Sequence, residues 1–448
     1  MRRHLALATV LFLALTSAVS AQQPFERLRR SCGAYYGERD PFGFPVRVYF
    51  VSQTPYNFWL GGQDLFFIWC KANAGDWIAD ADSAMSCNGN VSPASIGAYP
   101  ADGPFGKLAF GIQTFDDSAR IPFQCELLQQ FITLRLLAAQ NYLDLTIAIL
   151  DELLATLTNS SRDALSSSRN ATSLFADDAW VGKLLSADSP YTAIIDQYTS
   201  VGQFRRIIND SAGKPRELLR ADPDAADTAA TVLADAVAND RNLARRLRYE
   251  TKDEFRTAIR DAATRTVLAN PIAPGGKELL VLVLRPVRDV DHDMILLLRR
   301  QVPAAAERAG VAKREQRVPA ERSAADAERM MDPGPFLAGF GKAGADSYTV
   351  RLFDPWSRTL ADQDVRDYQS LLHLARIWGT LAGLTHRQGN EEQIAHKLHA
   401  DLNSAIRTRS DAYLKQLRED YDRFNNDSKA IAAADAGRLA VQNASNSP

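Results

Sequence analysis

The sequence has almost no net charge and, beyond its first residues, no long uncharged apolar run. Its 52 Lys and Arg residues nearly balance 54 Asp and Glu residues, which leaves a formal net charge of −2. Nucleic-acid-binding proteins concentrate basic charge on one face or segment, so that class of function is disfavoured. A permanent membrane span needs about 20 predominantly apolar residues. We therefore expect neither a nucleic-acid partner nor a membrane span after the N-terminal segment.

The first 21 residues have the three parts of a secretory signal peptide. A basic head precedes the apolar run 5–15, and the small residues Val19 and Ala21 stand just before a cut at Gln22. The apolar run is too short to remain as a membrane anchor. The sequence thus predicts cleavage after residue 21 and a periplasmic or secreted protein.

Cysteines are few and lie early in the chain. The four are Cys32, Cys70, Cys87 and Cys125. None of them forms the close CxxC pair that is typical of zinc sites. An even number of cysteines in an exported chain indicates disulfides. The sequence therefore predicts two disulfides, whose connectivity it leaves open.

The first part of the mature chain, 22–157, has a pattern typical of short strands followed by helix. β-Branched and aromatic residues concentrate in 46–51, 64–70 and 107–112, which predicts strands there. From 125 to 157, apolar residues recur at helical spacing without Pro or Gly. That pattern predicts one long buried helix or two abutting ones.

The second part, 173–436, is predicted to be mainly helical, because apolar residues again recur at helical spacing. Within it, a β-hairpin is expected at 277–300 and a further strand at 347–353. The last residues, 437–448, are polar and are expected to be disordered. These elements place the chain in the α+β class.

Two neighbouring motifs point to a chemistry. GNVSPASIG spans Gly89 to Gly97, and FGIQTFDDSARIPFQCELLQQ begins at Phe110. They resemble the GDAHxxNFG loop and the NDFDE and PFEWDLKRLAAS segments of the bacterial domain-of-unknown-function family 2252. The family pattern is similar to the catalytic loop and metal-binding Asp of kinase-like phosphotransferases. The resemblance implies a kinase-like fold, with mixed or antiparallel sheet portions and a large helical part.

Further segments resemble the family in the same order along the chain. They are DPFGFPVRVYF (40–50), LLLRRQVP (296–303), AERMMDPGPFLAGF (327–340), YTVRLF (348–353), LAGLTHRQG (381–389) and DAYLKQLREDYDRF (411–424). The resemblance therefore covers most of the chain, roughly 35–425.

The sequence departs from the family pattern at the residues that would carry phosphoryl transfer. The proton-accepting Asp of the loop is Asn90, its His is Ser92 and its metal-binding Asn is Ser95. An Asn cannot accept the proton, and Ser is a poor ligand for a hard cation. The family's strand Lys is replaced by Arg299, which stays charged and still suits an anion. The motif thus looks like the shell of a site.

The candidate site residues follow from this resemblance. For an enzyme of altered chemistry the acid–base or ligand groups are Asp116, Asp117 and Glu126; for ligand binding the residues are Gly89, Asn90, Ser92, Ser95, Gly97, Arg299, Arg351 and His386. The sequence predicts that the Gly89–Gly97 loop, Asp116 and the strand of Arg299 line one cleft, with Arg351 and His386 near it. An unpaired buried charge is costly, so Arg299 is expected to pair internally with one of the three carboxylates.

Three function classes stay open. The favoured one is an exported, catalytically degenerate protein that binds a small anionic ligand or an envelope protein. The alternative is an active enzyme, phosphotransferase-like or hydrolytic, although no GxSxG elbow is present. The third is a structural or envelope-associated protein with no small-molecule site. No cofactor or metal is expected, because the cluster of His386, His396, His399, Glu391 and Glu392 lacks an HExxH spacing.

Overall fold

The described part of the chain is mostly helical and contains one large antiparallel sheet. The computed structural model describes residues 24–36, 42–89, 91–101, 107–186, 191–209, 215–220, 222–266, 277–285, 292–312, 316–353, 358–387 and 391–446. The predicted α+β class is confirmed. The predicted signal peptide and Asn90 lie outside the described residues. Among the helices in these ranges, none has the length and apolar character that crossing a bilayer requires.

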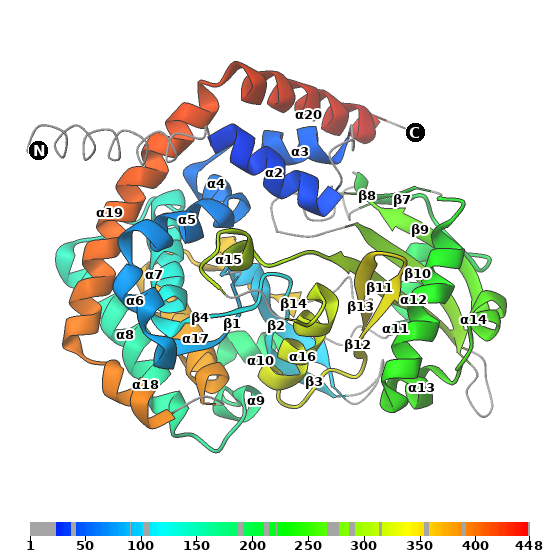
Figure 1. Cartoon of the computed structure of the whole chain (residues 1–448), viewed down its shortest axis with the longest axis horizontal. Coiled ribbons are helices and arrows are strands. Elements are labelled where there is room, and N and C mark those ends of the chain that lie inside the picture. Colours follow the sequence, from blue (N-terminus) through cyan, green and yellow to red (C-terminus); the bar gives the residue numbers. More distant parts are fainter. Residues whose placement is uncertain are drawn as a thin grey trace, which may run out of the picture.

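Helices dominate the beginning and the end of the chain (Figure 1). The first group is α2 (Pro24–Tyr36), α3 (Gly43–Val51), α4 (Pro55–Gly61), α5 (Gln63–Asn73), α6 (Gly75–Ala79), α7 (Phe123–Gln140), α8 (Ile147–Leu165), α9 (Ala171–Leu174) and α10 (Ala179–Leu185). The middle group is α11 (Tyr191–Tyr198), α12 (Ala225–Asn239), α13 (Arg241–Leu247), α14 (Lys252–Ala258), α15 (Ala305–Arg308) and α16 (Pro319–Met330). The last group is α17 (Tyr368–His386), α18 (Glu391–Lys397), α19 (Ala400–Asn425) and α20 (Ser428–Asn446).

Seven antiparallel strands form the main sheet, in the order β12-β13-β11-β10-β9-β8-β7. Their bounds are β7 (Ile207–Asn209), β8 (Pro215–Arg220), β9 (Ile259–Arg265), β10 (Glu278–Arg285), β11 (His292–Gln301), β12 (Ala338–Ala343) and β13 (Asp346–Leu352). Three small sheets pair β1 (Ala84–Cys87) with β4 (Ala119–Pro122), β2 (Ile96–Pro100) with β3 (Leu108–Ile112) and β14 (Arg358–Thr359), and β5 (Thr199–Ser200) with β6 (Gln203–Phe204). The hairpin predicted at 277–300 is therefore confirmed as β10 and β11.

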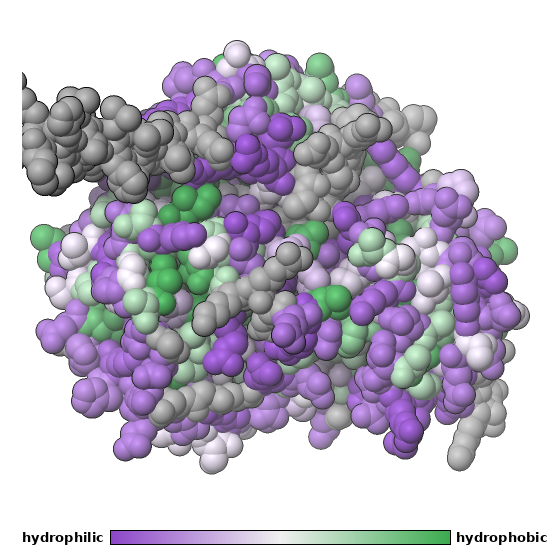
Figure 2. Space-filling model, in the orientation of Figure 1, coloured by the Kyte–Doolittle hydropathy of each residue, from purple (hydrophilic) through white to green (hydrophobic). Residues whose placement is uncertain are grey.

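Buried apolar side chains form two separate clusters. The larger one fills the helical part around α5, α7, α8 and α17, and the smaller one lies between the main sheet and α12 to α14. Backbones come close at glycines in both. A Cβ on Gly341 in β12 would lie 2.0 Å from the carbonyl O of Val232 in α12. A Cβ on Gly379 in α17 would lie 2.2 Å from the carbonyl O of Leu157 in α8. Figure 2 shows mainly hydrophilic residues on one outer face, with apolar residues in scattered groups.

Segments 46–51 and 64–70, for which the sequence predicts strands, are helices α3 and α5. Both segments are buried on several sides, so their apolar residues do not show a clear period of 2 or 3.6. The helix start between them is marked by local signals. Thr54 accepts a hydrogen bond from the backbone N of Asn57 at 3.0 Å, and Pro55 occupies the first turn. In a buried region, an N-cap hydrogen bond and a proline in the first turn therefore indicate a helix better than the β-strand preference of the residues indicates a strand.

The C-terminal segment is helical where the sequence predicts disorder. Helix α20 continues through Asn446 and packs along α3, as Figure 1 shows at the top of the molecule. The close approach depends on Gly437, because a Cβ there would lie 2.0 Å from the carbonyl O of Pro45. Tertiary packing thus orders a polar segment that its own composition would leave disordered.

Candidate functional site

A row of alternating charges crosses the face of the main sheet that meets the helical part. Arg265, Glu278 and Arg299 are direct cross-strand partners on β9, β10 and β11, so their side chains share one face. Arg265 Nη1 lies 2.8 Å from Glu278 Oε2, and Arg299 Nη2 lies 2.5 Å from Glu278 Oε1. Arg265 also pairs with Glu217, to which Tyr198 donates a hydrogen bond. We call these residues, together with Asp116 and Arg351, the ion-pair cluster.

Asp116 closes this cluster from the helical part. It lies in the turn between β3 and β4 and is only 3% exposed. Arg299 Nη1 donates to Asp116 Oδ2, and Gln301 Nε2 donates to Oδ1 at 2.6 Å. Both carboxylate oxygens are therefore engaged, and the predicted internal pair between Arg299 and Asp116 is present. Burial opposes the charge of Arg299, but the carboxylates of Asp116 and Glu278 outweigh it and raise the pKa of Arg299.

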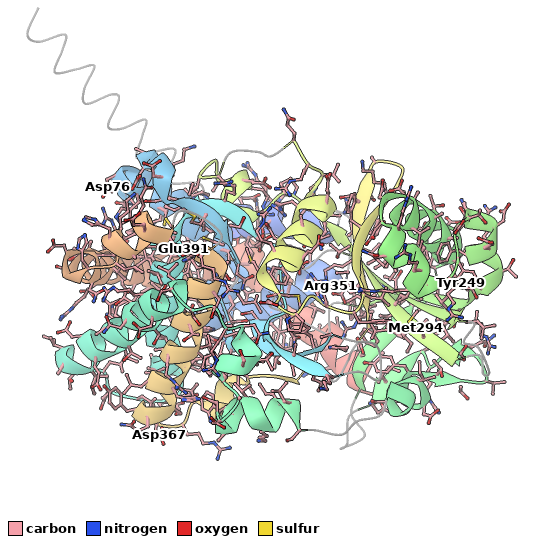
Figure 3. The ribbon with its side chains drawn as sticks, turned by 90° about the horizontal axis from the view of Figure 1, so that it is seen from below. Asp76, Tyr249, Met294, Arg351, Asp367 and Glu391 are labelled. Carbon is pink, nitrogen blue, oxygen red and sulfur yellow. The ribbon has the colours of Figure 1, made fainter. Side chains whose placement is uncertain are left out.

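Arg351 adds a third guanidinium to this face. It stands two residues after Thr349, which pairs with Arg299 across the strands. Its Nη1 donates to the carbonyl O of Gln113 at 2.7 Å, and its guanidinium lies 5.8 Å from the ring centre of Phe115. Burial lowers the pKa of Arg351. Figure 3 shows Arg351 where the sheet meets the helical elements.

The charges of the ion-pair cluster balance. Its three arginines, Arg265, Arg299 and Arg351, face the carboxylates of Glu217, Glu278 and Asp116. An anionic ligand that approached Arg265 or Arg299 would have to compete with a carboxylate already held there. Arg351 instead donates to the carbonyl O of Gln113 and forms no ion pair among the described residues. The cluster therefore has the electrostatics of a structural network, with no surplus positive charge to attract an anion.

Asp117 makes structural contacts through both its side chain and its backbone. Its Oδ1 accepts a hydrogen bond from the backbone N of Ala305 at 3.0 Å, where α15 begins. Its carbonyl O faces Gly89, where an added Cβ would lie only 1.9 Å away. Gly89 has a φ of 70°, in the left-handed region that favours glycine. The first motif glycine is thus required by its contact with Asp117.

The loop serines stabilise a local turn. Ser95 Oγ donates to the carbonyl O of Ser92 at 2.6 Å, and Ser95 is 2% exposed. The carbonyl O of Ser95 accepts from the backbone N of Gln113 at 2.8 Å, which joins the loop to the end of β3. Gly97 lies within β2, opposite Gly111 of β3. In these contacts the Ser95 hydroxyl bonds to the backbone of Ser92, and the backbone of Ser95 bonds to β3.

Glu126, His386 and Cys87 form a second buried polar group, which we call the Cys–Glu–His cluster. Glu126 lies in the first turn of α7, His386 ends α17 and Cys87 ends β1. His386 Nε2 lies 2.7 Å from Glu126 Oε2 and 3.7 Å from Cys87 Sγ. The backbone N of Asn88 donates to Glu126 Oε1 at 3.0 Å. All three side chains are at most 1% exposed.

The Cys–Glu–His cluster does not have the geometry of a cysteine-hydrolase triad. In such a triad the nucleophile and the orienting carboxylate bond to different ring nitrogens of the His. Here Cys87 and Glu126 both face Nε2, while Nδ1 of His386 has no hydrogen-bond partner among the described residues. Burial, and next the Glu126 carboxylate, raise the pKa of the Cys87 thiol well above its usual value, so the thiolate is disfavoured.

The predicted disulfides are wrong for the cysteines that the structure describes. Cys70, Cys87 and Cys125 are free and buried, and the side chain of Cys32 lies outside the described part. An even number of cysteines in an exported chain indicates disulfide pairing, but buried thiols also serve as small apolar groups in a core. Here they belong to the larger apolar cluster. Burial raises the pKa of the Cys70 thiol, and contact with Cys125 adds to that shift.

The free thiols give a direct expectation. Because Cys70, Cys87 and Cys125 are buried, we expect these three thiols not to react with Ellman's reagent in the native protein at about pH 8, where an exposed thiol is partly ionised. Denaturation without reductant should release at least these thiols. A denatured sample that reacts only after reduction would show that the cysteines are paired.

For most contacts in the two clusters, the sequence predicted one of the two interacting residues and missed the other. It named Asp116, Arg299, Arg351, Glu126 and His386, and the structure places the first three in the ion-pair cluster and the last two in the Cys–Glu–His cluster. It missed their partners Glu278, Gln301 and, as a polar contact, Cys87. The sequence KELL opposite LLLRR hinted at Glu278, but strand register was needed to place it against Arg299.

Comparison with known proteins agrees with the motifs. A family model described as an uncharacterized protein conserved in bacteria, DUF2252, matches residues 39–427. The chain belongs to this family. Neither a curated protein nor a solved structure matches the chain.

Proposed function

We propose that this chain is an exported, catalytically inactive member of its family, with a kinase-like fold, and that it acts by binding. The observation that carries the proposal is the pair between Arg299 and Asp116. In kinase-like phosphotransferases the equivalent Asp holds Mg²⁺ and the strand cation holds phosphate oxygens. In this chain the two groups neutralise each other, so neither is available for a nucleotide.

The remaining candidate catalytic carboxylates support the same reading. Asp117 and Glu126 are each 1% exposed. Asp117 accepts from the backbone of Ala305, and Glu126 accepts from Asn88 and contacts His386. A general acid or base must come within hydrogen-bond reach of the substrate proton. Both carboxylates are buried and already bonded within the protein, and this weighs against the alternative of an enzyme with altered chemistry.

The charge balance of the ion-pair cluster bears on the binding partner. A small anion would have to displace Asp116 or Glu278 from guanidinium groups that already hold them. Breaking a buried ion pair is costly because it leaves the displaced charge uncompensated. Of the two partner classes, a small anion or an envelope protein, we therefore favour the protein, bound on the outer surface.

Nucleotide titration tests the proposal. We expect calorimetry with Mg·ATP, Mg·ADP and inorganic phosphate to show no saturable binding tighter than about 1 mM, and no transfer of the γ-phosphate to protein or water. The variant Arg299→Lys restores the family residue and serves as the matched comparison. It should stay inactive, because the loop still lacks its Asp and Asn. Micromolar, Mg²⁺-dependent binding with phosphate transfer would overturn the proposal.

A further inference from the structure

The Cys–Glu–His cluster is not used by the proposed function, yet its three side chains converge on one point. Cys87 Sγ, one Glu126 carboxylate oxygen and one His386 ring nitrogen all lie within 4.8 Å of one another. The three residues come from β1, α7 and α17 and are fully buried. A hydrogen-bond relay would use both ring nitrogens of His386, whereas here the three potential ligand atoms lie close enough together for one ion to contact all of them.

The distance between the sulfur and the nitrogen fits a tetrahedral zinc ion, and the carboxylate would have to move. With Zn–S of about 2.3 Å and Zn–N of about 2.0–2.1 Å, the sulfur and nitrogen ligands stand about 3.6 Å apart. Cys87 Sγ and His386 Nε2 are 3.7 Å apart. The Glu126 oxygen lies 2.7 Å from Nε2, and it would have to withdraw by about 0.7 Å to reach the corresponding ligand spacing.

The charge of the Cys–Glu–His cluster also favours a bound cation. Among the described residues, Glu126 forms an ion pair only with His386, and no Lys or Arg contacts its carboxylate. A buried carboxylate is unfavourable without a countercharge. A divalent ion held by Cys87, Glu126 and His386 would supply this countercharge.

We propose that Cys87, Glu126 and His386 bind a divalent transition-metal ion, with zinc as the preferred metal. Thiolate and imidazole ligands favour zinc over Mg²⁺ or Ca²⁺, which take oxygen ligands. The fourth position falls to a water molecule or to the carbonyl O of Ile121, which lies 3.7 Å from Cys87 Sγ. The site is structural, because it joins the ends of three elements and holds the backbone of Asn88 through Glu126.

The sequence did not predict this metal site, because the proposed ligands are far apart in the chain. Glu126 and His386 are 260 positions apart, and no short metal motif connects them. Because the cluster is fully buried, the ion enters before folding is complete. We therefore expect slow loss to chelators from the native protein and fast loss from the denatured protein.

Metal analysis of the full chain tests the proposal. Protein refolded with equimolar zinc and then desalted should hold about one zinc per chain. Refolding with Co²⁺ should give the thiolate-to-cobalt charge-transfer absorption of a Cys-ligated site. Cys87→Ser and His386→Gln should each lower the retained metal at least about tenfold, while Cys70→Ser, a buried thiol outside the cluster, should retain it.

Two results would overturn the proposal. The first is wild-type protein that holds less than about a tenth of a zinc per chain and shows no cobalt charge-transfer band, which would leave the cluster as a hydrogen-bond group alone. The second is full metal retention by Cys87→Ser, which would place the ion elsewhere. If Cys87→Ser fails to fold, the cobalt spectrum of the wild-type protein decides the question without it.

Discussion

Arg299→Met is expected to lower the free energy of unfolding by about 3–5 kcal/mol, the range typical of removing one partner from a buried ion pair. Arg299 holds Asp116 and Glu278 at once and is only 15% exposed on its side chain. Methionine fills a similar volume but leaves two buried carboxylates short of a countercharge. Thermal or urea unfolding of the purified variant measures the effect.

The neighbouring arginine provides a matched control. Arg300 follows on the same strand and pairs with Asp346 at 2.8 Å, with side-chain exposures of 28% and 42%. Such a pair is largely solvated, so Arg300→Met should cost no more than about 1 kcal/mol. Arg299→Lys should fall between the two variants, because one ammonium cannot reproduce the planar fork that reaches both carboxylates. If Arg299→Met keeps the wild-type stability but loses binding of an anion, Arg299 is a ligand residue and the network is not structural.

The loss of stability caused by Arg299→Met should also depend on pH. Burial raises the pKa of Glu278, but Arg299 and Arg265 outweigh burial and hold it below its ordinary value. A depressed carboxyl pKa contributes stability that is present above the unfolded pKa and is lost as pH falls through the folded pKa. Without Arg299, burial gains weight and the pKa of Glu278 rises. The stability gap between wild type and Arg299→Met should therefore narrow as pH falls below about 4.5, because the contribution of Glu278 to the wild-type stability is lost there.

The ion-pair cluster shows what a sequence can and cannot reveal about such a site. The pairing of Arg299 with an acidic group follows from the cost of a buried charge alone, so it needed no coordinates. Glu278 could not be assigned in the same way, because a slip of one residue in strand pairing would turn its side chain to the opposite face. Its place depends on the register between β10 and β11, which the hairpin sequence does not fix.

Local patterns failed where burial was nearly complete. In α3 and α5 the side chains pack on several sides, so apolar periodicity could not separate helix from strand. The same burial explains the cysteines, which behave as core residues of the helical part. In both cases the environment of the residue, which the sequence does not state, decided the outcome.

Gly89→Ala is expected to destabilise the protein by about 2–5 kcal/mol, although it adds a single methyl group. Two costs combine. The φ of 70° costs an alanine about 1–2 kcal/mol, and the added Cβ would lie 1.9 Å from the carbonyl O of Asp117, so the backbone must move at an overpacking cost of about 1–3 kcal/mol. The displaced turn also carries Asp116, so the pair with Arg299 is disturbed. Urea unfolding of the variant measures the sum.

Gly344→Ala separates the two costs and decides why the motif keeps its glycine. Gly344 has a φ of 61°, but an added Cβ there meets nothing within 4 Å, so only the conformational cost of about 1–2 kcal/mol should appear. An excess loss in Gly89→Ala over Gly344→Ala then measures the contact with Asp117. Equal losses would mean that the loop yields, and that the glycine needs another explanation. An excess would mean that Gly89 is required by the packing of this fold without any phosphate present. The fold would then require Gly89 even though the loop lacks the family's Asp, His and Asn. A motif glycine alone would therefore not indicate that phosphoryl transfer is retained.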